Sequence, residues 1–169
     1  LYYGANRLYR SLNRGEDLKA ISPDLTNGGR KGDVSYGTLT TIHESPLKFG
    51  LIYTGSDDGM VYVSRDGGEE WENISAGLPS QMWVSQVYAS HHKESRVYVS
   101  LNGYRWDHFT PYIFVSDDYG KNWKRISVDL PAEAVNVVKE DPLVEGLIYA
   151  GTDHSIYVSY NKGEKWWAF

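Results

Sequence analysis

The chain has 169 residues, of which 41% are hydrophobic and 14% aromatic, which is enough apolar material for a folded core. Its formal net charge of −5 disfavours a nucleic-acid partner, and no apolar run reaches the length of a membrane-spanning helix. It contains no cysteine, which excludes disulfide bonds and leaves the compartment open.

Short runs rich in β-branched and aromatic residues recur along the chain, and they predict β-strands. No long stretch has the period of an amphipathic helix, so we expect an all-β fold. In chain order the expected strands form four groups: 1–5, 7–11 and 18–22; then 36–44, 51–55, 60–64 and 71–75; then 84–90, 96–101, 112–116 and 123–127; and finally 134–140, 147–151, 155–159 and 166–169.

One pattern, Ser-x-Asp/Asn-x-Gly-x-x-Trp/Leu, separates the last two strands of every group. Its copies recur every 43 to 53 residues, the size of a four-stranded propeller blade, and they start at Ser11, Ser64, Ser116 and Ser159. We therefore predict an all-β fold, a β-propeller arc of about four blades of four-stranded antiparallel sheets in a single segment, 1–169. The blades are expected at about 1–25, 34–79, 83–131 and 134–169.

The first of these blades lacks its innermost strand, and the chain starts and stops inside strands. Unpaired apolar strands at both ends are an aggregation liability. The arc is therefore expected to belong to a larger propeller, whose remaining blades come from the same polypeptide.

The chemistry of the repeated pattern is that of a closed turn. An Asp or Asn side chain bonds the backbone two residues on, and Gly accepts a conformation that other residues resist. The Trp is a large apolar anchor that wedges between neighbouring sheets. A calcium site is disfavoured because the twelve-residue loop with a terminal Glu is absent. We assign a structural role, with no metal or cofactor, to Ser11, Asn13, Gly15, Ser64, Asp66, Gly68, Trp71, Ser116, Asp118, Gly120, Trp123, Ser159, Asn161, Gly163 and Trp166.

Successive turns of a meander alternate between two faces, and the face opposite the repeated turns carries two long loops, 23–35 and 102–111. Long loops on a rigid scaffold are where binding usually resides. In the second loop Tyr104 or Trp106 can stack on a sugar ring or a peptide side chain, and Arg105 can fork onto a carboxylate. The candidate ligand-binding residues are Tyr104, Arg105, Trp106, Asp107, His108, Arg30 and Asp33.

A structural interpretation of loop 102–111 stays open. In it, Trp106 and Phe109 pack the loop onto the blade, while Arg105 and Asp107 pair with each other. Trp83 is interpreted as either a rim contact or a core residue.

A catalytic interpretation centres on Asp107 as a general acid. Glycoside hydrolysis needs two carboxylates that converge on one bond, and the candidates for the second carboxylate are Asp33, Asp57 and Asp153. The sequence does not show that any pair converges.

The four patterns resemble Asp-box repeats (bacterial neuraminidase repeats), which occur in sialidases, sortilin-type receptors and xyloglucanase-like hydrolases. More closely, four segments resemble large bacterial proteins with sortilin-like propellers that are often labelled glycosyl hydrolases: 4–11, 21–25, 35–41 and 109–114. The sequence departs from the repeat at Leu18, which replaces Trp, and at Asn13 and Asn161, which replace Asp. It has no Arg-Ile-Pro start, and neither the arginine triad of a sialidase nor the catalytic Asp motifs of a xyloglucanase can be assembled from it.

The resemblance implies an exported protein, which is periplasmic, at the cell surface or secreted. Our first hypothesis is a ligand-binding or protein-interaction scaffold that recognises a glycan or a peptide. The alternative is part of a glycoside hydrolase catalytic propeller, whose carboxylates come partly from other blades. A third interpretation is a structural arc that supports other domains.

Overall fold

The computed structural model describes residues 1–28 and 36–169, so the candidates Arg30 and Asp33 lie outside the described residues. The strands of the first two sheets are β1 (Tyr2–Gly4), β2 (Leu8–Arg10), β3 (Lys19–Ala20), β4 (Leu39–Glu44), β5 (Ile52–Ser56), β6 (Val61–Ser64) and β7 (Glu72–Asn73). Those of the other two are β8 (Trp83–Ala89), β9 (Val97–Gly103), β10 (His108–Ser116), β11 (Lys124–Arg125), β12 (Val135–Glu140), β13 (Ile148–Thr152), β14 (Ile156–Ser159) and β15 (Trp167–Ala168). A short 3-10 helix, η1 (Tyr104–Trp106), connects β9 to β10.

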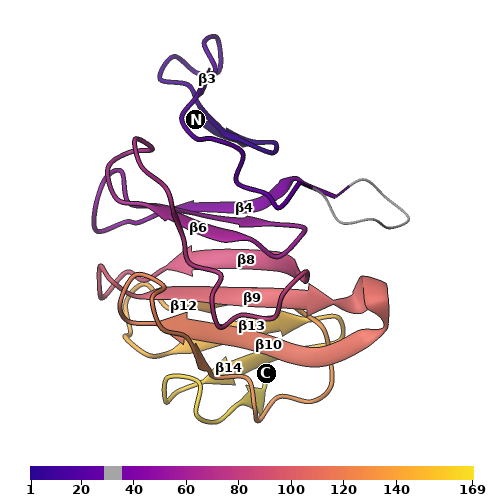
Figure 1. The fold of residues 1–169 in the computed structure, drawn as a ribbon. Coiled ribbons are helices and arrows are strands. Elements are labelled where there is room, and N and C mark those ends of the chain that lie inside the picture. Colours follow the sequence, from indigo (N-terminus) through magenta and orange to yellow (C-terminus); the bar gives the residue numbers. More distant parts are fainter. Residues whose placement is uncertain (29–35) are drawn as a thin grey trace.

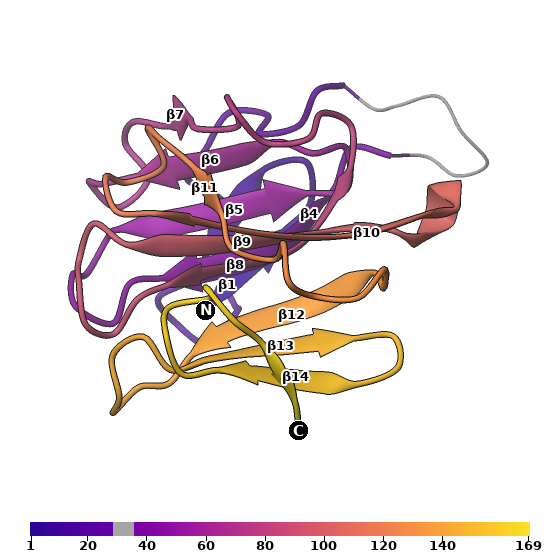
Figure 2. The ribbon, with the colours of Figure 1, turned by 90° about the horizontal axis from the view of Figure 1, so that it is seen from below.

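Each sheet is an antiparallel meander, in the orders β1-β2-β3, β4-β5-β6-β7, β8-β9-β10-β11 and β12-β13-β14-β15. The sheets follow one another as blades from the indigo to the yellow end of the chain (Figures 1 and 2). The innermost strands β4, β8 and β12 lie next to one another in that order. This architecture is a partial β-propeller and confirms the all-β prediction. In the described part of the chain the first blade has three strands and lacks the innermost one.

The outermost strands are two residues long, shorter than the sequence predicted. The residue at the Trp position of the repeated pattern precedes each of these strands. In the second blade, for example, Trp71 contacts the first blade before β7 begins at Glu72. Strand pairing therefore starts one residue later than the apolar pattern indicates.

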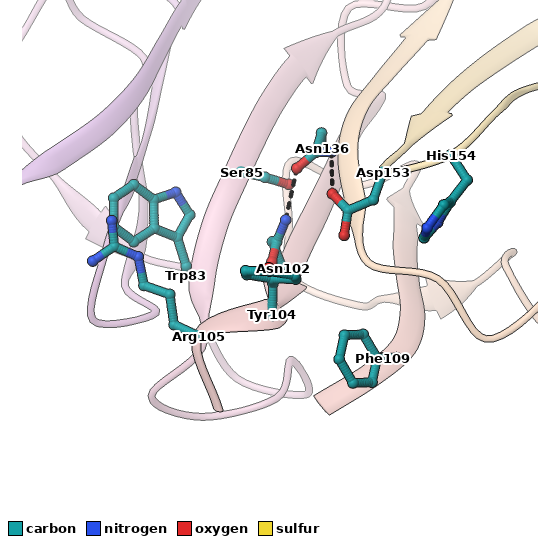
Figure 3. A pocket seen from close by; sticks show the side chains of 9 residues that line it. All are labelled: Trp83, Ser85, Asn102, Tyr104, Arg105, Phe109, Asn136, Asp153 and His154. Atoms are coloured by element: carbon teal, nitrogen blue, oxygen red, sulfur yellow. Dashed lines mark hydrogen bonds between the residues drawn. The ribbon is translucent and has the colours of Figure 1, made fainter. Parts of the chain in front are cut away.

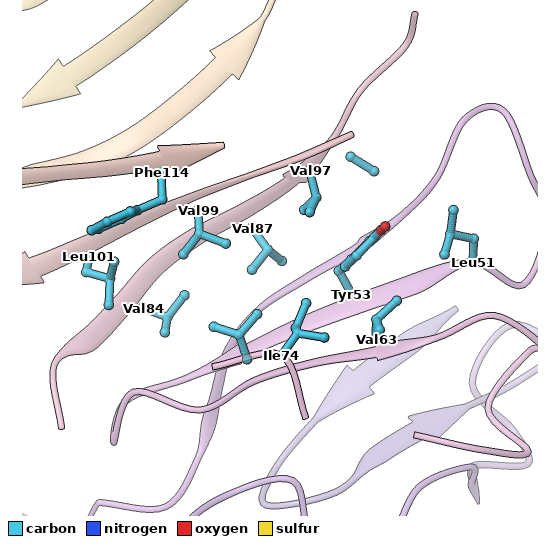
Figure 4. Packing of buried hydrophobic residues seen from close by; sticks show 12 residues of the cluster. Leu51, Tyr53, Val63, Ile74, Val84, Val87, Val97, Val99, Leu101 and Phe114 are labelled. Atoms are coloured by element: carbon cyan, nitrogen blue, oxygen red, sulfur yellow. The ribbon is translucent and has the colours of Figure 1, made fainter. Parts of the chain in front are cut away.

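Apolar side chains between successive blades form the core. Tyr53 of β5 is fully buried, and Val84 and Val87 of β8 in the third blade belong to the same cluster. Figure 4 shows this packing between the two sheets. The buried members of the cluster are Leu51, Tyr53, Val61, Val63, Ile74, Val84, Val87, Ala89, Val97, Val99, Leu101 and Phe114.

The four repeated turns close through the same hydrogen bonds. In each, the Ser hydroxyl donates to the side-chain oxygen of the Asp or Asn two residues on, at 2.8, 2.8, 2.7 and 3.0 Å in chain order. The Gly N–H donates back to the same Ser oxygen at 2.7, 2.8, 2.8 and 2.9 Å. The Asp or Asn also accepts from backbone N–H groups further along the turn, so its polar atoms are used within the turn itself.

The Gly and Trp of these turns also join each blade to the one before it. The Trp123 indole N–H donates to the carbonyl of Ile74 at 2.8 Å, and a Cβ on Gly120 would lie 2.4 Å from the Ile74 side chain. The same pair of contacts recurs at the other two blade boundaries. We call it the interblade clamp, and its residues are Gly68 and Trp71 on Ile21, Gly120 and Trp123 on Ile74, and Gly163 and Trp166 on Ile126.

An ion-pair network centred on the buried Arg96 and Glu140 also links the third and fourth blades. Arg96 donates to Asp117 at 2.6 Å, to Glu145 at 2.9 Å and to Glu140 at 3.4 Å. Glu140 is fully buried and also accepts from the Tyr98 hydroxyl at 2.9 Å. Because a buried charge needs compensation, these groups depend on one another.

The segment predicted as a long loop, 102–111, is an extended hairpin. Strand β9 continues to Gly103 and β10 begins at His108, so η1 and Asp107 alone make the turn. Asp107 adopts a left-handed conformation (φ 53°), and its N–H donates to the carbonyl of Tyr104 at 3.1 Å. The prediction of a loop here is wrong because pairing between β9 and β10 resumes across an irregular register that includes Pro111. The hairpin projects beyond the other blades (Figure 2).

Candidate functional site

The three innermost strands share one irregularity, a register shift near the start of the strand. The shift leaves Thr40, Ser85 and Asn136 as the bulged residues of β4, β8 and β12. Thr40 and Ser85 donate to carbonyls of the next innermost strand, at 2.6 Å and 2.8 Å. The exposed Asn136 side chain instead bonds two other side chains. β12 is the last innermost strand among the described residues, so no later strand offers Asn136 such a carbonyl, and its side chain bonds toward the third blade and the turn after β13 instead.

A pocket of about 600 Å³ lies at this place, between the third and fourth blades. It is on the face opposite the repeated turns, next to the projecting hairpin. Figure 3 shows the side chains that line it. Its lining residues come from β8, the β9–β10 hairpin, β12 and the turn between β13 and β14: Trp83, Ser85, Asn102, Tyr104, Arg105, Phe109, Asn136, Asp153 and His154.

One wall of the pocket is a row of planar polar groups that crosses the blade boundary. The Asn102 amide donates to the side-chain oxygen of Asn136 at 2.7 Å, and the Asn136 amide donates to Asp153 at 2.8 Å. Asn102 also accepts from the backbone N–H of Tyr104 at 2.8 Å. The second hydrogen of each amide and the second carboxylate oxygen of Asp153 are available in addition to these bonds. The row, Asn102–Asn136–Asp153, thus offers donors and acceptors side by side.

The other wall of the pocket is aromatic. The Tyr104 and Phe109 side chains are 60% and 41% exposed, and their rings meet edge to face with centroids 6.1 Å apart. The Arg105 guanidinium lies over the Trp83 ring at 4.7 Å, which extends the flat surface and places a cation at its rim. Exposed aromatic faces beside planar polar groups suit a ligand with both apolar faces and hydroxyl or amide edges.

Of the binding residues predicted in the hairpin, Tyr104 and Arg105 line the pocket. The Trp106 ring lies 6.0 Å from that of Tyr36, in the direction of the second blade. Asp107 is exposed at the tip of the turn and does not line the pocket. His108 stacks on Tyr112 and shares a 3.0 Å hydrogen bond with its hydroxyl.

The structural interpretation of loop 102–111 differs from this geometry at Arg105 and at Phe109. In the described residues no ion pair joins Arg105 to Asp107, because the guanidinium lies over Trp83 instead. Trp83 is half-buried and belongs to the pocket rim, whereas Phe109 faces the pocket next to Tyr104.

The carboxylates considered as catalytic partners have different surroundings. Asp57 is buried and accepts from the backbone N–H groups of Gly37 and Thr38, at 2.8 Å and 2.9 Å. Asp153 follows β13 as Asp57 follows β5, yet it is exposed and holds a side chain, Asn136. Asp153 supplies the single carboxylate among the described residues that line the pocket.

His43 of β4 is hydrogen-bonded to the third blade. Its Nδ1 accepts from the backbone N–H of Ala89 at 3.1 Å, and its ring lies 4.7 Å from that of Tyr88. Burial, with smaller contributions from His91 and Lys139, lowers the pKa of His43 to about 4. The imidazole is therefore neutral at physiological pH and serves as an acceptor between two innermost strands.

Sequence reasoning missed the central members of the pocket, Asn102 and Asn136. They are 34 residues apart and meet because two blades pack together. A comparison of equivalent positions in the repeats would have pointed to Asn136, since Thr40 and Ser85 occupy the same place in the earlier blades. No group of three or more His, Cys, Asp or Glu residues with metal-binding geometry occurs in residues 1–28 and 36–169. No helix in the same described ranges is long and apolar enough to cross a membrane.

The fold and the pocket define a partial β-propeller with a ligand-sized hollow between two blades. No family model and no curated protein matches the chain. Solved structures do resemble it. The GH74 xyloglucanase from Xanthomonas campestris matches over 100% of the chain with a TM-score of 0.71 and 19% identity. YCF48 bound to D1 peptide matches over 77% of the chain with a TM-score of 0.59 and 21% identity. An extracellular domain assigned to a one-component system from B. thetaiotaomicron matches over 99% with a TM-score of 0.66 and 18% identity.

At these identities the likeness shows the fold alone. The chain spans 27%, 38% and 20% of the three matched chains, respectively. The β-propeller is thus shared with an enzyme, a peptide-binding protein and an extracellular domain, and the activity depends on the site.

Proposed function

We propose that the chain is a segment of a larger, exported propeller of the Asp-box, sortilin-like type, and that it binds a glycan or a peptide in the pocket between the third and fourth blades. The observation that carries the proposal is the pairing of two exposed aromatic rings, Tyr104 and Phe109, with the row Asn102–Asn136–Asp153. Partly exposed aromatic residues beside available polar groups are what a binding site needs and what a core avoids.

A glycan fits this chemistry most directly. A sugar ring has an apolar face that can stack on Tyr104 or Phe109, and hydroxyls that both donate and accept. The row supplies amide donors and carboxylate acceptors at neighbouring positions. A peptide is the second ligand class. Its aromatic or aliphatic side chain would take the aromatic wall and its carboxyl group the guanidinium of Arg105.

The comparisons support the proposal by analogy. YCF48 has a structure with a bound D1 peptide, and the X. campestris protein is a xyloglucanase, so propellers with this arrangement of blades serve both ligand classes. The B. thetaiotaomicron domain is extracellular, which supports export.

The test is a binding screen of the chain against a glycan panel and a peptide library, followed by affinity measurements on variants. Tyr104→Ala and Asp153→Asn should each weaken binding about tenfold, since each removes a central contact. Tyr160→Ala is the matched control, because Tyr160 is 68% exposed and lies outside the pocket. It should change affinity by less than about twofold. Absence of any ligand, or equal losses in Tyr160→Ala and Tyr104→Ala, would contradict the proposal.

The alternative function is part of a glycoside hydrolase. The pocket supplies one carboxylate, Asp153, and the second would come from Asp107 or from other blades. This alternative predicts that Asp153→Asn abolishes hydrolysis of a bound glycan by the full-length protein. If a bound glycan is not hydrolysed by that protein, binding alone is the function.

A further inference from the structure

Side chains of the second blade close the free edge of the innermost strand of the third. Strand β8 lies at the edge of its sheet and pairs with β9 alone, so the N–H groups on its other edge need partners elsewhere. Two of these partners come from β4. The Thr41 hydroxyl oxygen accepts from the Val87 N–H at 3.2 Å, and Nδ1 of His43 accepts from the Ala89 N–H at 3.1 Å. These side chains therefore take the place of a neighbouring strand.

The boundary between the third and fourth blades has a similar arrangement without a histidine. By pairing register, Gln86 stands in β8 where Thr41 stands in β4, and Tyr88 stands where His43 does. The side-chain oxygen of Gln86 accepts from the Val138 N–H at 3.1 Å, and the Tyr88 hydroxyl donates to a carbonyl of β12 at 3.2 Å. Of these four side chains, His43 alone has an acceptor that a proton can remove in mildly acidic solution.

The surroundings of His43 oppose a positive charge. Burial lowers its pKa most, and the charges of His91, which follows β8, and Lys139 of β12 lower it further. Tyr53 of β5 is its cross-strand neighbour, and the Tyr88 ring lies 4.7 Å away. Burial raises the pKa of both phenols, so neither offers an anion. No carboxylate within residues 1–28 and 36–169 forms an ion pair with His43.

Protonation changes what the imidazole can do at this contact. A charged imidazole carries a hydrogen on both ring nitrogens, so Nδ1 of His43 can no longer accept from the Ala89 N–H. Two donors then face each other, and a cation lies in the field of His91 and Lys139. The charged ring is hydrated only when β4 and β8 move apart, because a buried charge without a partner is costly. Uptake of the proton and opening of the contact are therefore linked.

We propose that the hydrogen bond between His43 and Ala89 is an acid-sensitive contact: uptake of a proton by His43 opens the boundary between the second and third blades, while the boundary between the third and fourth blades stays closed. The proposal goes beyond ligand binding, since it concerns a different pair of blades and needs no ligand. It gives the propeller one defined place at which an acidic medium loosens it.

The experiment is amide hydrogen exchange of the chain at about pH 7.5 and about pH 5, read at Ala89 and at Val138 and corrected for the intrinsic exchange rates. The closed contact binds the proton more weakly than the open one, so acid favours the open contact. With a pKa of about 4 when closed and the ordinary 6.5 when open, opening should be about thirtyfold more frequent at the lower pH. Exchange at Ala89 should accelerate by this factor. Exchange at Val138, which Gln86 holds, should accelerate by less than about threefold.

His43→Asn is the matched variant, because an amide oxygen can stand where Nδ1 stands and takes up no proton in this pH range. In this variant exchange at Ala89 should change by less than about threefold between the two pH values. His154→Asn removes an exposed histidine from a turn of the fourth blade and should keep the full acid response at Ala89. An acid response at Ala89 that survives in His43→Asn would overturn the proposal, and so would equal acceleration at Ala89 and Val138 in the unsubstituted chain.

A second measurement needs no substitution and so does not depend on the folding of a variant. An NMR titration follows the ring signals of His43 in the unsubstituted chain. They should remain those of a neutral imidazole down to about pH 5 as long as the chain is folded. A midpoint near the ordinary value of 6.5 would overturn the proposal, because the closed contact would then accept the proton without opening.

Discussion

Replacement of Gly120 by alanine tests whether the interblade clamp stabilises the propeller. Gly120 has φ +91°, and a Cβ would lie 2.4 Å from Cδ1 and 2.9 Å from Cβ of Ile74 in the preceding blade. The backbone conformation costs alanine about 1–2 kcal/mol, and overpacking adds about 1–3 kcal/mol. We expect a total loss of about 3 kcal/mol, which for a chain of this size lowers Tm by roughly 6–12 °C.

Gly77→Ala is the matched control for this loss. Gly77 has nearly the same φ, +90°, but a Cβ there would find Trp123 at 3.8 Å, an ordinary contact. The control should lose about 1–2 kcal/mol, the backbone cost alone. Calorimetry and urea unfolding of both variants measure the difference. Equal losses would refute the reasoning, because they would show that contact with Ile74 contributes nothing.

Three further changes test the packing and the turns. Trp123→Phe leaves the Ile74 carbonyl without its 2.8 Å donor and should cost about 1–3 kcal/mol in urea unfolding; no loss would contradict the clamp. Arg96→Met leaves the buried Glu140 uncompensated and should cost about 3–5 kcal/mol, and a neutral result would show that the network is dispensable. Hydrogen bonds from Asn122 and Ser116 lower the pKa of Asp118 from 3.8 to about 2. The ionised carboxylate contributes its full stabilisation above pH about 4, and this contribution is lost as pH falls towards 2. In Asp118→Asn the free energy of unfolding should therefore fall less steeply between pH 4 and pH 2 than in the unsubstituted chain. An equally steep fall would show that Asp118 does not cause the acid sensitivity.

The repeated turns could be predicted because their interactions are local. The bonds of Ser116 to Asp118 and Gly120 span two and four residues, so the pattern itself contains both partners. The same locality explains why the blades could be ordered from the sequence. Each turn marks the boundary between the last two strands of one sheet.

The hairpin after β9 could not be predicted in the same way. Asn102, Gly103 and Asp107 are turn-forming residues, and Pro111 removes a backbone donor, so the segment reads as a loop. In the structure the irregular pairing is supported from outside the strand, since Arg125 donates to the Pro111 carbonyl at 2.7 Å. That support comes from a residue 14 positions away, beyond the reach of local patterns.

The polar wall of the pocket required the packing of two blades. In the sequence Asn102 falls in the predicted loop 102–111 and Asn136 in the predicted strand 134–140, and nothing local links them. Asp153 is a candidate carboxylate from a neighbouring loop, and its difference from Asp57 lies in its exposure and its bond to Asn136.

The most direct test of the proposed function is an NMR titration of the chain with the best ligand of the glycan and peptide screens. The side-chain amide signals of Asn102 and Asn136 report on the pocket, and that of Asn122, which bonds Asp118 at 2.7 Å in a repeated turn, reports on the opposite face. We predict saturable shifts of the Asn102 and Asn136 amides with no change at Asn122. Shifts at Asn122 without shifts at Asn136 would place the ligand elsewhere and contradict the account.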